Sequence, residues 1–241
     1  MRALPPPPPV QDDWSLFLDL DGTLVDFAER PEAIDVCDRL RGLLGAVHQR
    51  LGGRVAVVSG RALSDLDGRL ALPELALAGS HGAERRAAGA AAVLAEHTPA
   101  VAAATAEAQL FAAEHGLICE AKPTGVALHF RPRADLEAAV EAFAADLARR
   151  HALRLQRGAM VRELRAPGLD KGDALRLFMA EAPFSAGTPV MVGDDVTDED
   201  GFAAANALGG TSVLVGPERD TVARFRLADV AAVRQWLQPE R

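Results

Sequence analysis

Two short apolar stretches in this chain end in pairs of carboxylates, and they restrict the fold more than any other feature of the sequence. The first stretch, residues 15–20, contains Asp19 near its end and is followed by Asp21. The second, residues 189–192, is followed by Gly193-Asp194-Asp195. Apolar runs of this length are typical of strands that are buried on both faces of a parallel sheet. Because helical stretches separate such runs along the chain, we predict a parallel sheet with helices on both faces.

The other elements of this predicted core follow the same alternation. A helix is expected from Pro31 to Gly52-Gly53, a strand at 55–58 that ends in Ser59-Gly60-Arg61, and a strand at 75–78 that leads into the loop 79–84. Toward the other end of the chain, we expect helices at 171–181, 199–208 and 227–237 and a strand at 211–215.

The alternation of strand and helix changes in the middle of the chain. The pattern there is helix, two strands, helix and two strands, at residues 99–115, 117–122, 126–131, 134–150, 153–156 and 160–165, with the last turn at Arg157-Gly158. Such an order predicts a small antiparallel sheet backed by helices, inserted into the core. The predicted fold class is therefore α/β, a doubly wound parallel-sheet (Rossmann-like) core with an inserted α+β cap domain. We assign residues 1–10 to a proline-rich leader, 11–97 and 167–241 to the core, and 98–166 to the cap.

Composition excludes several classes of protein. The formal net charge of −8 argues against a general nucleic-acid-binding protein, which needs a basic face, although a locally positive site for a small anion remains compatible with it. No apolar run approaches the roughly 20 residues that span a bilayer, so we expect no membrane partner. Pro5 to Pro9 stand where a signal peptide needs an apolar segment, and we expect a cytoplasmic monomer with an extended, mobile leader. Cys37 and Cys119 are interpreted as buried small hydrophobic residues.

The polar ends of the predicted strands indicate where chemistry takes place. Open parallel sheets bind ligands beyond the carboxyl ends of their strands, so these ends would meet in one crevice if the strands are neighbours. A single Asp-Gly could be a helix cap or a turn, but two acidic strand ends would repel each other unless a cation binds among them. Oxygen ligands alone favour Mg²⁺ over Zn²⁺ as that cation.

The spacing of Asp19 and Asp21 suggests a division of labour between two carboxylates. One could attack phosphorus as a covalent nucleophile while the other transfers the proton of the leaving group. Ser59 could donate a hydrogen bond to a phosphoryl oxygen, and Lys171 could neutralise the charge that develops there. Only two of the 26 basic residues are lysines, Lys122 and Lys171, which marks both as candidates for sites that need a compact ammonium group.

These stretches resemble the four motifs of haloacid dehalogenase-like phosphatases, in order along the chain. The motifs are Asp19-Leu20-Asp21-Gly22-Thr23-Leu24, Ser59-Gly60-Arg61, Lys171, and Gly193-Asp194-Asp195-Val196-Thr197-Asp198. The resemblance implies a core of that type, with Asp19 as nucleophile and Asp21 as general acid and base. It also implies Mg²⁺ bound by Asp19, Asp194 and the backbone carbonyl of Asp21, supported by Asp195 and Asp198. Thr23, Gly60 and Arg61 are further candidates for substrate binding within the same motifs.

A second group of residues bears on the substrate. His81 and Glu84, in the loop 79–84, are candidates for substrate binding, although His81 could be a turn residue and Glu84 a solvated charge. In the cap, strand alternation places His129 and Arg131 on one face. Together with Lys122 and Glu163 they suit a polyhydroxyl ligand with a phosphate, although a hydrated sheet face with ion pairs would look the same.

This combination of loop, cap and motifs resembles the trehalose-6-phosphate phosphatase family over nearly the whole chain after the prolines. The resemblance implies hydrolysis of trehalose 6-phosphate to trehalose and phosphate, with Lys122, His129, Arg131 and Glu163 contacting the disaccharide. Phe130 stands where that family often has Tyr. The alternatives are a broader sugar-phosphate phosphatase of the same superfamily and a non-catalytic sugar-phosphate sensor. An inserted cap also predicts opening and closing about links near His97 and Pro167.

Overall fold

The computed structural model describes residues 4–26, 34, 36–90, 92–94, 98–122, 124–166 and 170–238. The chain forms two compact units, Met1–Val93 with Asp170–Arg241, and Leu94–Leu169. The expected links near His97 and Pro167 lie outside the described residues. We call the first unit the core and the second the cap, and each is described by itself.

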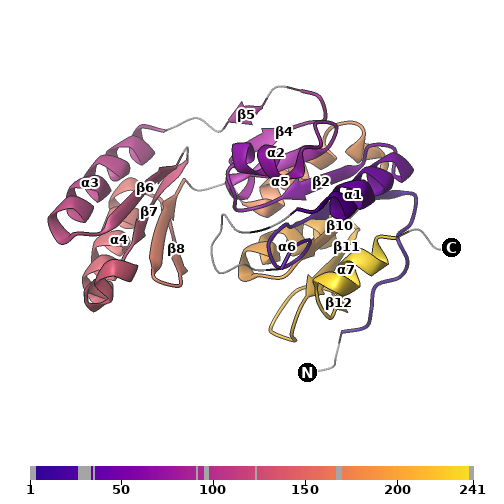
Figure 1. The fold of residues 1–241 in the computed structure, drawn as a ribbon. Coiled ribbons are helices and arrows are strands. Elements are labelled where there is room, and N and C mark those ends of the chain that lie inside the picture. Colours follow the sequence, from indigo (N-terminus) through magenta and orange to yellow (C-terminus); the bar gives the residue numbers. More distant parts are fainter. Residues whose placement is uncertain are drawn as a thin grey trace. The chain divides into compact units, whose positions relative to one another are not determined.

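The core is built on one eight-stranded sheet (Figure 1). From edge to edge its strands are β12 (Phe225–Leu227), β11 (Thr211–Val215), β10 (Thr188–Gly193), β1 (Trp14–Leu18), β2 (Val55–Val58), β3 (Ala76–Gly79), β4 (Glu84–Arg86) and β5 (Val93–Leu94). The six strands from β12 to β3 pair in parallel, and β4 pairs antiparallel to β3. The central strand β1 therefore has β10 on one side and β2 on the other, which decides where the functional residues meet.

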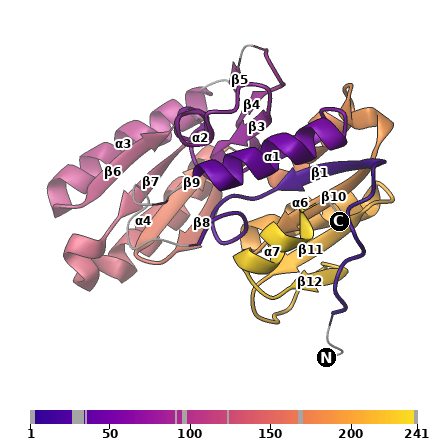
Figure 2. The ribbon, with the colours of Figure 1, turned by 45° about the vertical axis from the view of Figure 1, so that its right-hand side comes forward.

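Alternate residues of these strands enter two different hydrophobic clusters, as expected for a sheet covered on both faces. On β1, Leu16 and Leu18 pack with α1 (Asp38–Arg50), α2 (Leu63–Leu70) and α7 (Val230–Trp236). Phe17 points to the other face and packs with α5 (Lys171–Met179) and α6 (Glu199–Ala207). Figure 2 shows α1 and α7 on the near side of the strands.

Two helix boundaries differ from the prediction. The first helix begins at Asp38, since Cys37 has an extended backbone and the buried Ile34 and Val36 precede it outside the helix. The predicted start at Pro31 lies outside the described residues. The last helix begins at Val230, where the Asp229 side chain accepts a hydrogen bond from the Ala232 amide at 2.8 Å. The sequence did not predict β12, which ends at Leu227, two residues before Asp229.

The proline-rich segment is extended, as expected, but it makes contacts with the core. The carbonyl oxygen of Pro5 accepts a hydrogen bond from the Arg226 amide on the edge strand β12 at 3.0 Å. That of Pro8 accepts one from Trp236 Nε1 at 2.7 Å, and Val10 is buried among core residues. Since proline carries no amide proton, such a segment can cover a sheet edge without offering a new ladder of donors.

Trp236→Phe tests this attachment, because it keeps an aromatic ring and removes the donor to Pro8. We expect a loss of about 1 kcal/mol, which lowers Tm by about 2–4 °C for a chain of this size. Hydrogen exchange of the Arg226 amide should also become faster. Gln11→Ala is the matched control, since Gln11 Nε2 donates to the Pro9 carbonyl, only two residues away along the chain. An unchanged Tm together with unchanged exchange at Arg226 would contradict the attachment.

The cap contains an antiparallel four-stranded sheet with two helices packed on one face (Figure 1). The strand order is β6 (Ile118–Lys122), β7 (Gly125–His129), β9 (Val161–Arg165) and β8 (Arg154–Gly158), and the helices are α3 (Pro99–His115) and α4 (Glu137–His151). Val126, Leu128 and Leu164 face the helices and form the cluster that holds this unit together.

Two predictions about the cap strands are wrong. Arg131 does not share the β7 face with His129, because Phe130 leaves the strand with ψ 16° and Arg131 begins a 3-10 helix, Arg131–Leu136. The turn between β8 and β9 lies at Ala159-Met160 rather than Arg157-Gly158, and Met160 takes the left-handed backbone with φ 62°. Arg157 instead pairs with Arg162 within the ladder. None of the helices in the described ranges of the chain combines the length and apolar character of a membrane span.

Candidate active site

The candidate site lies where β10, β1 and β2 end side by side. Asp19 follows β1 and continues the pairing, since its amide donates to the Val192 carbonyl of β10 at 2.9 Å. Asp194 follows β10. Ser59 follows β2, and its amide donates a hydrogen bond to the Ala78 carbonyl of β3. Parallel neighbours end at the same edge of a sheet, so three separate motifs meet there.

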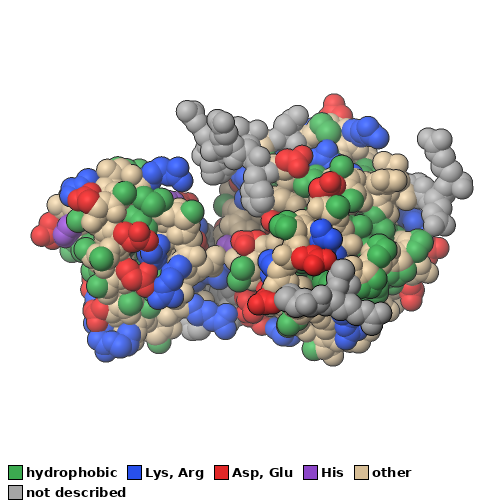
Figure 3. Space-filling view, turned by 90° about the horizontal axis from the view of Figure 1, so that it is seen from below, with side chains coloured by type: hydrophobic (Ala, Val, Ile, Leu, Met, Phe, Trp, Pro, Cys, Tyr) green, Lys and Arg blue, Asp and Glu red, His purple; other side chains and the backbone are tan. Residues whose placement is uncertain are grey.

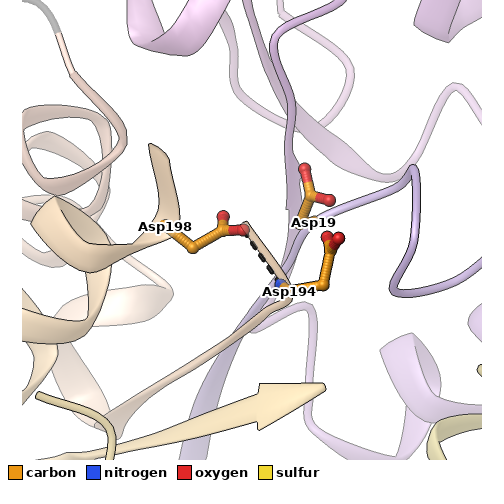
Figure 4. A group of neighbouring side chains, drawn as sticks. All are labelled: Asp19, Asp194 and Asp198. Carbon is orange, nitrogen blue, oxygen red and sulfur yellow. Dashed lines mark hydrogen bonds between the residues drawn. The ribbon is translucent and has the colours of Figure 1, made fainter. Parts of the chain in front are cut away.

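Three carboxylates form a cluster at this edge (Figure 4). One oxygen each of Asp19, Asp194 and Asp198 lies within 4.8 Å of the others. Asp198 is fully buried, and its Oδ2 accepts hydrogen bonds from the amides of Asp194 and Asp195, both at 3.0 Å. Its Oδ1 accepts from Lys171 at 2.6 Å. Both oxygens of Asp198 are therefore occupied by protein donors.

Lys171 connects this cluster to the start of α5. Its Nζ donates to Asp19 Oδ1 at 2.7 Å and to Asp198, and the side chain is buried. Burial lowers the pKa of a lysine, but the charges of Asp19 and Asp198 more than compensate and raise the pKa of Lys171 above its ordinary value. The Asp170 side chain caps α5 through the Asp173 amide, which fixes where the lysine emerges. Lys171 is thus a buried ion-pair partner and not a solvated residue at a helix end.

The cluster carries more negative charge than Lys171 can balance. Burial raises the pKa of Asp19, and the carboxylates of Asp198 and Asp194 add to the rise while Lys171 opposes it. Burial and Asp198 also raise the pKa of Asp194 to about 6. Carboxylate oxygens that are crowded and short of positive charge are the donor set that suits a hard divalent cation. Asp19 and Asp194 fit as ligands, whereas the occupied oxygens of Asp198 fit a supporting role.

Asp21 and Thr23 lie in the turn that follows Asp19. Asp21 accepts a two-pronged contact from Arg61, at 2.7 Å from Nε to Oδ2 and 2.8 Å from Nη2 to Oδ1. Arg61 also donates to Asp65, and its hydrogen bond to Asp21 is the main reason that the pKa of Arg61 is raised. The Thr23 hydroxyl donates to Asp194 Oδ1 at 3.3 Å. Arg61, expected to bind substrate, is thus held on Asp21 in this structure.

The loop 79–84 packs against the loop after β2. The amides of Ser80 and His81 donate to the carbonyls of Arg61 and Ser59, at 2.6 and 2.9 Å. The His81 ring is so close to Gly60 that an added Cβ there would lie 2.7 Å from it, so any other residue at this position requires the His81 ring to move. The loop therefore fixes the position of Ser59 and Arg61.

Glu84 has a similar supporting position. It is buried, and its Oε2 accepts hydrogen bonds from the Leu63 amide at 2.6 Å and from the Ser80 hydroxyl at 3.1 Å. It is therefore not the solvated charge of the alternative interpretation. Substrate contacts of His81 and Glu84 stay predictions.

Three of the four cap residues singled out by the sequence, Lys122, His129 and Glu163, lie on one face of the cap sheet. Lys122 Nζ donates to Glu163 Oε2 at 3.0 Å, and His129 Nε2 lies 3.0 Å from Glu120 Oε2. The register places Glu120 and Glu163 on either side of Ala127, on the face opposite the helices. Sequence reasoning missed Glu120, although its spacing of two from Lys122 on a strand could have revealed it.

Charged side chains are intermixed on the surface drawn in Figure 3, where acidic and basic groups lie among one another. The cap also contains ion pairs between partly exposed side chains, such as Arg150–Glu107 at 2.6 Å. The Lys122–Glu163 pair does not distinguish a sugar-binding sheet face from a hydrated face with ion pairs, because it is expected on both. Substrate contacts of Lys122, His129, Arg131 and Glu163 therefore stay predictions.

Comparison with known proteins shows which family the chain belongs to. The profile of the Trehalose-phosphatase family matches residues 17–231. The chain belongs to the trehalose-phosphatase family. It is 37% identical over 235 residues to the trehalose-6-phosphate phosphatase of Escherichia coli K12, covering 96% of this chain and 88% of that protein. It is 37% identical over 209 residues to a probable trehalose-phosphate phosphatase of Sinorhizobium fredii, covering 86% and 79% of the two chains. The prediction of a phosphatase is thereby confirmed.

Solved structures have the same fold. A crystal structure described as a trehalose-6-phosphate phosphatase related protein superposes with a TM-score of 0.71 at 27% identity, covering 92% of this chain and 94% of that one. The C-terminal domain of trehalose-6-phosphate phosphatase from Candida albicans gives a TM-score of 0.78 at 22% identity, covering 94% and 91%. A phosphatase of the haloalkanoate (HAD) superfamily from Bacteroides thetaiotaomicron gives 0.66 at 20%, covering 92% and 91%. The predicted core with an inserted cap is confirmed.

Asp194→Asn tests the electrostatic state of the cluster in protein freed of metal by EDTA. Because the pKa of Asp194 is raised to about 6 in the folded state, the folded protein binds more protons than the unfolded one between about pH 4 and 6. Its free energy of unfolding therefore falls as pH rises through that window. The variant avoids this loss. With solvent screening of the partly exposed side chain, we expect it to gain about 1 kcal/mol, or about 2–4 °C in Tm, at neutral pH.

Thermal unfolding at about pH 4.5 and pH 7.5 measures this effect. The gain of Asp194→Asn over the wild-type protein should be large at the higher pH and small at the lower one. Asp38→Asn is the control, because that side chain is fully exposed. A gain that is equal at both pH values, or absent at both, would contradict the raised pKa.

Proposed function

We propose that this chain hydrolyses trehalose 6-phosphate to trehalose and inorganic phosphate. The observation that carries the proposal is the buried Lys171 between Asp19 and Asp198, beside Asp194, in a chain of the trehalose-phosphatase family. A carboxylate fixed at a strand end by an ammonium group, with further carboxylates around it, is suited to phosphoryl transfer through an aspartyl-phosphate.

The proposed cofactor is Mg²⁺, bound by the carboxylates of Asp19 and Asp194 and by the backbone carbonyl of Asp21. Asp198 and Asp195 would support these ligands, since Asp198 holds the amides of Asp194 and Asp195. When bound, the ion would draw off negative charge from the phosphoryl oxygens and balance the carboxylate cluster.

In the first half of the proposed reaction, an oxygen of Asp19 attacks phosphorus and forms an acyl-phosphate bond. The bond between phosphorus and the sugar 6-oxygen breaks, its electron pair stays on that oxygen, and Asp21 transfers a proton to it. In the second half, Asp21 removes a proton from water, the water oxygen attacks phosphorus, and the bond to Asp19 breaks. Phosphate leaves, and both aspartates return to their starting states.

The other core residues would orient the phosphoryl group. Lys171 donates a hydrogen bond to one oxygen of Asp19 and so fixes the orientation of that carboxylate. The positive charge of Lys171 would also stabilise the anionic transition state. Ser59 is held at the end of β2 by the contacts of the loop 79–84, and its hydroxyl would donate to a phosphoryl oxygen. For proton transfer, the Asp21 side chain would have to leave Arg61 and turn toward the oxygen of the leaving group.

The cap residues would select the disaccharide. We propose that Lys122, His129, Arg131 and Glu163, with His81 and Glu84 of the core loop, bind or help to position the sugar hydroxyls. A group of cations and carboxylates that must be satisfied by hydroxyl groups rejects a ligand lacking them more strongly than an apolar pocket would. This makes the cap the origin of substrate choice, and the core the origin of the chemistry.

Asp19→Asn tests the covalent mechanism, because an amide of nearly the same shape cannot attack phosphorus. Release of phosphate from trehalose 6-phosphate should fall by about 10³-fold or more. Binding of trehalose 6-phosphate, measured by calorimetry, should persist. Asp38→Asn, at a fully exposed position, should keep wild-type turnover. Turnover of Asp19→Asn within about tenfold of wild type would contradict an aspartyl-phosphate on Asp19.

A panel of sugar phosphates tests the substrate. We expect kcat/KM for trehalose 6-phosphate to exceed that for glucose 6-phosphate by about 10²-fold or more, because the second glucose unit supplies the contacts to the cap. Equal values would favour the broader sugar-phosphate phosphatase. Binding of trehalose 6-phosphate with no release of phosphate would instead favour the sensor.

A further inference from the structure

Arg219 contacts the segment that carries Asp194, although neither its sequence context nor any of the four motifs singled it out. It lies after β11, in the stretch between Val215 and β12. Its Nη2 donates to the backbone carbonyl of Asp195 at 2.8 Å. Its Nη2 and Nε also lie 3.3 and 3.4 Å from the carbonyl of Asp194. The planar guanidinium thus covers two successive carbonyl oxygens.

These contacts complete the restraint of the Asp194–Asp195 peptide units. Asp198 Oδ2 already accepts hydrogen bonds from the amides of the same two residues, both at 3.0 Å. The amide side of the segment is therefore held by a carboxylate and the carbonyl side by a guanidinium. With both sides held, the direction in which the Asp194 side chain leaves the backbone is fixed.

Glu199 holds Arg219 in place. Its Oε1 pairs with Arg219 Nη1, and its Oε2 accepts a hydrogen bond from the Val222 amide at 2.9 Å. Both side chains are about three-quarters buried, at 24% and 23% exposure, so the pair is shielded from solvent more than an ordinary surface ion pair. The first turn of α6 is in this way linked to the segment after β11 across the end of β10.

We infer that Arg219 is a positioning residue, which aims the Asp194 carboxylate at the divalent cation by holding the carbonyls of Asp194 and Asp195. This inference rests on the proposed metal-dependent function and adds a residue to it. Partners that orient a metal ligand without touching the metal typically change metal affinity by about 10- to 100-fold when they are removed.

The sign of the effect separates positioning from charge. A guanidinium near a cation site repels the cation, so removal of its charge alone would tighten Mg²⁺ binding. Removal would also leave Glu199 without its partner and make the region more negative, which again favours Mg²⁺. A loss of affinity in Arg219→Gln can therefore come only from the lost restraint on the Asp194 segment.

The test is calorimetric titration of the full chain, freed of metal with EDTA and dialysed, with MgCl₂ in the absence of substrate. We expect the Kd for Mg²⁺ to rise about tenfold in Arg219→Gln and by less in Arg219→Lys, which keeps the charge and can reach one carbonyl. Arg226→Gln is the matched control. Its Nε donates to the Gly216 carbonyl at 2.7 Å in the same part of the chain, and its Kd should stay within about twofold of wild type.

Kinetics provide a second readout. In Arg219→Gln, the Mg²⁺ concentration for half-maximal activity should rise by a similar factor, while kcat at saturating Mg²⁺ stays within about twofold of wild type. The double variant Arg219→Gln/Glu199→Gln removes both charges of the pair and should bind Mg²⁺ at least as weakly as Arg219→Gln.

Equal or tighter Mg²⁺ binding by Arg219→Gln would overturn this inference and leave the proposed function intact. Should Arg219→Gln not fold, Arg219→Lys decides in the same way: weaker binding supports the inference, and unchanged binding overturns it. A wild-type protein with no measurable Mg²⁺ binding would overturn the proposed cofactor and this inference with it.

Discussion

The candidate site depends on one buried ammonium group, that of Lys171, which lies between the carboxylates of Asp19 and Asp198. A charge in the protein interior is tolerated only when it is paired and hydrogen-bonded, so the three side chains must stay together. This contact joins the start of α5 to the end of β1 and to the turn after β10. Asp198 then transmits the restraint to the amides of Asp194 and Asp195. Catalytic geometry and local packing therefore share the same few contacts.

The site is also a place where stability is given up for function. Three carboxylates face one lysine, and burial with mutual repulsion raises the pKa values of Asp19 and Asp194. A protein without a ligand for this cluster would gain stability by losing one carboxylate. The excess of negative charge makes sense if a divalent cation is bound there. The two lysines of the chain are both paired with carboxylates, whereas arginines provide the planar contacts on Asp21 and on the Asp194 segment.

Much of the fold could be predicted because its signals are local. Buried strands such as β2 and helices such as α3 have their apolar pattern within a few residues, and the Asp-rich strand ends follow directly in sequence. The errors occurred where a tertiary contact competes with a local pattern. Arg131 leaves the strand because the chain turns at Phe130, whose ring is buried, and the proline segment is held by Trp236 from the far end of the described chain. Neither the turn at Phe130 nor the contact with Trp236 could be predicted from the residues next to it in the sequence.

The sequence by itself determined which groups are available: carboxylates after apolar runs, a lysine at the start of a helix, and a cap inserted before that lysine. Only the tertiary structure decided which of these groups meet. The order β10–β1–β2 brings Asp194, Asp19 and Ser59 to one edge, and pairing between strands far apart in sequence cannot be derived from a local pattern. The tertiary structure also distinguished Asp198, both of whose oxygens accept hydrogen bonds from protein donors, from the neighbouring Asp19 and Asp194. It placed Glu84, His81 and Arg219 in supporting contacts. Such assignments depend on distances between side chains, which one-dimensional spacing does not contain.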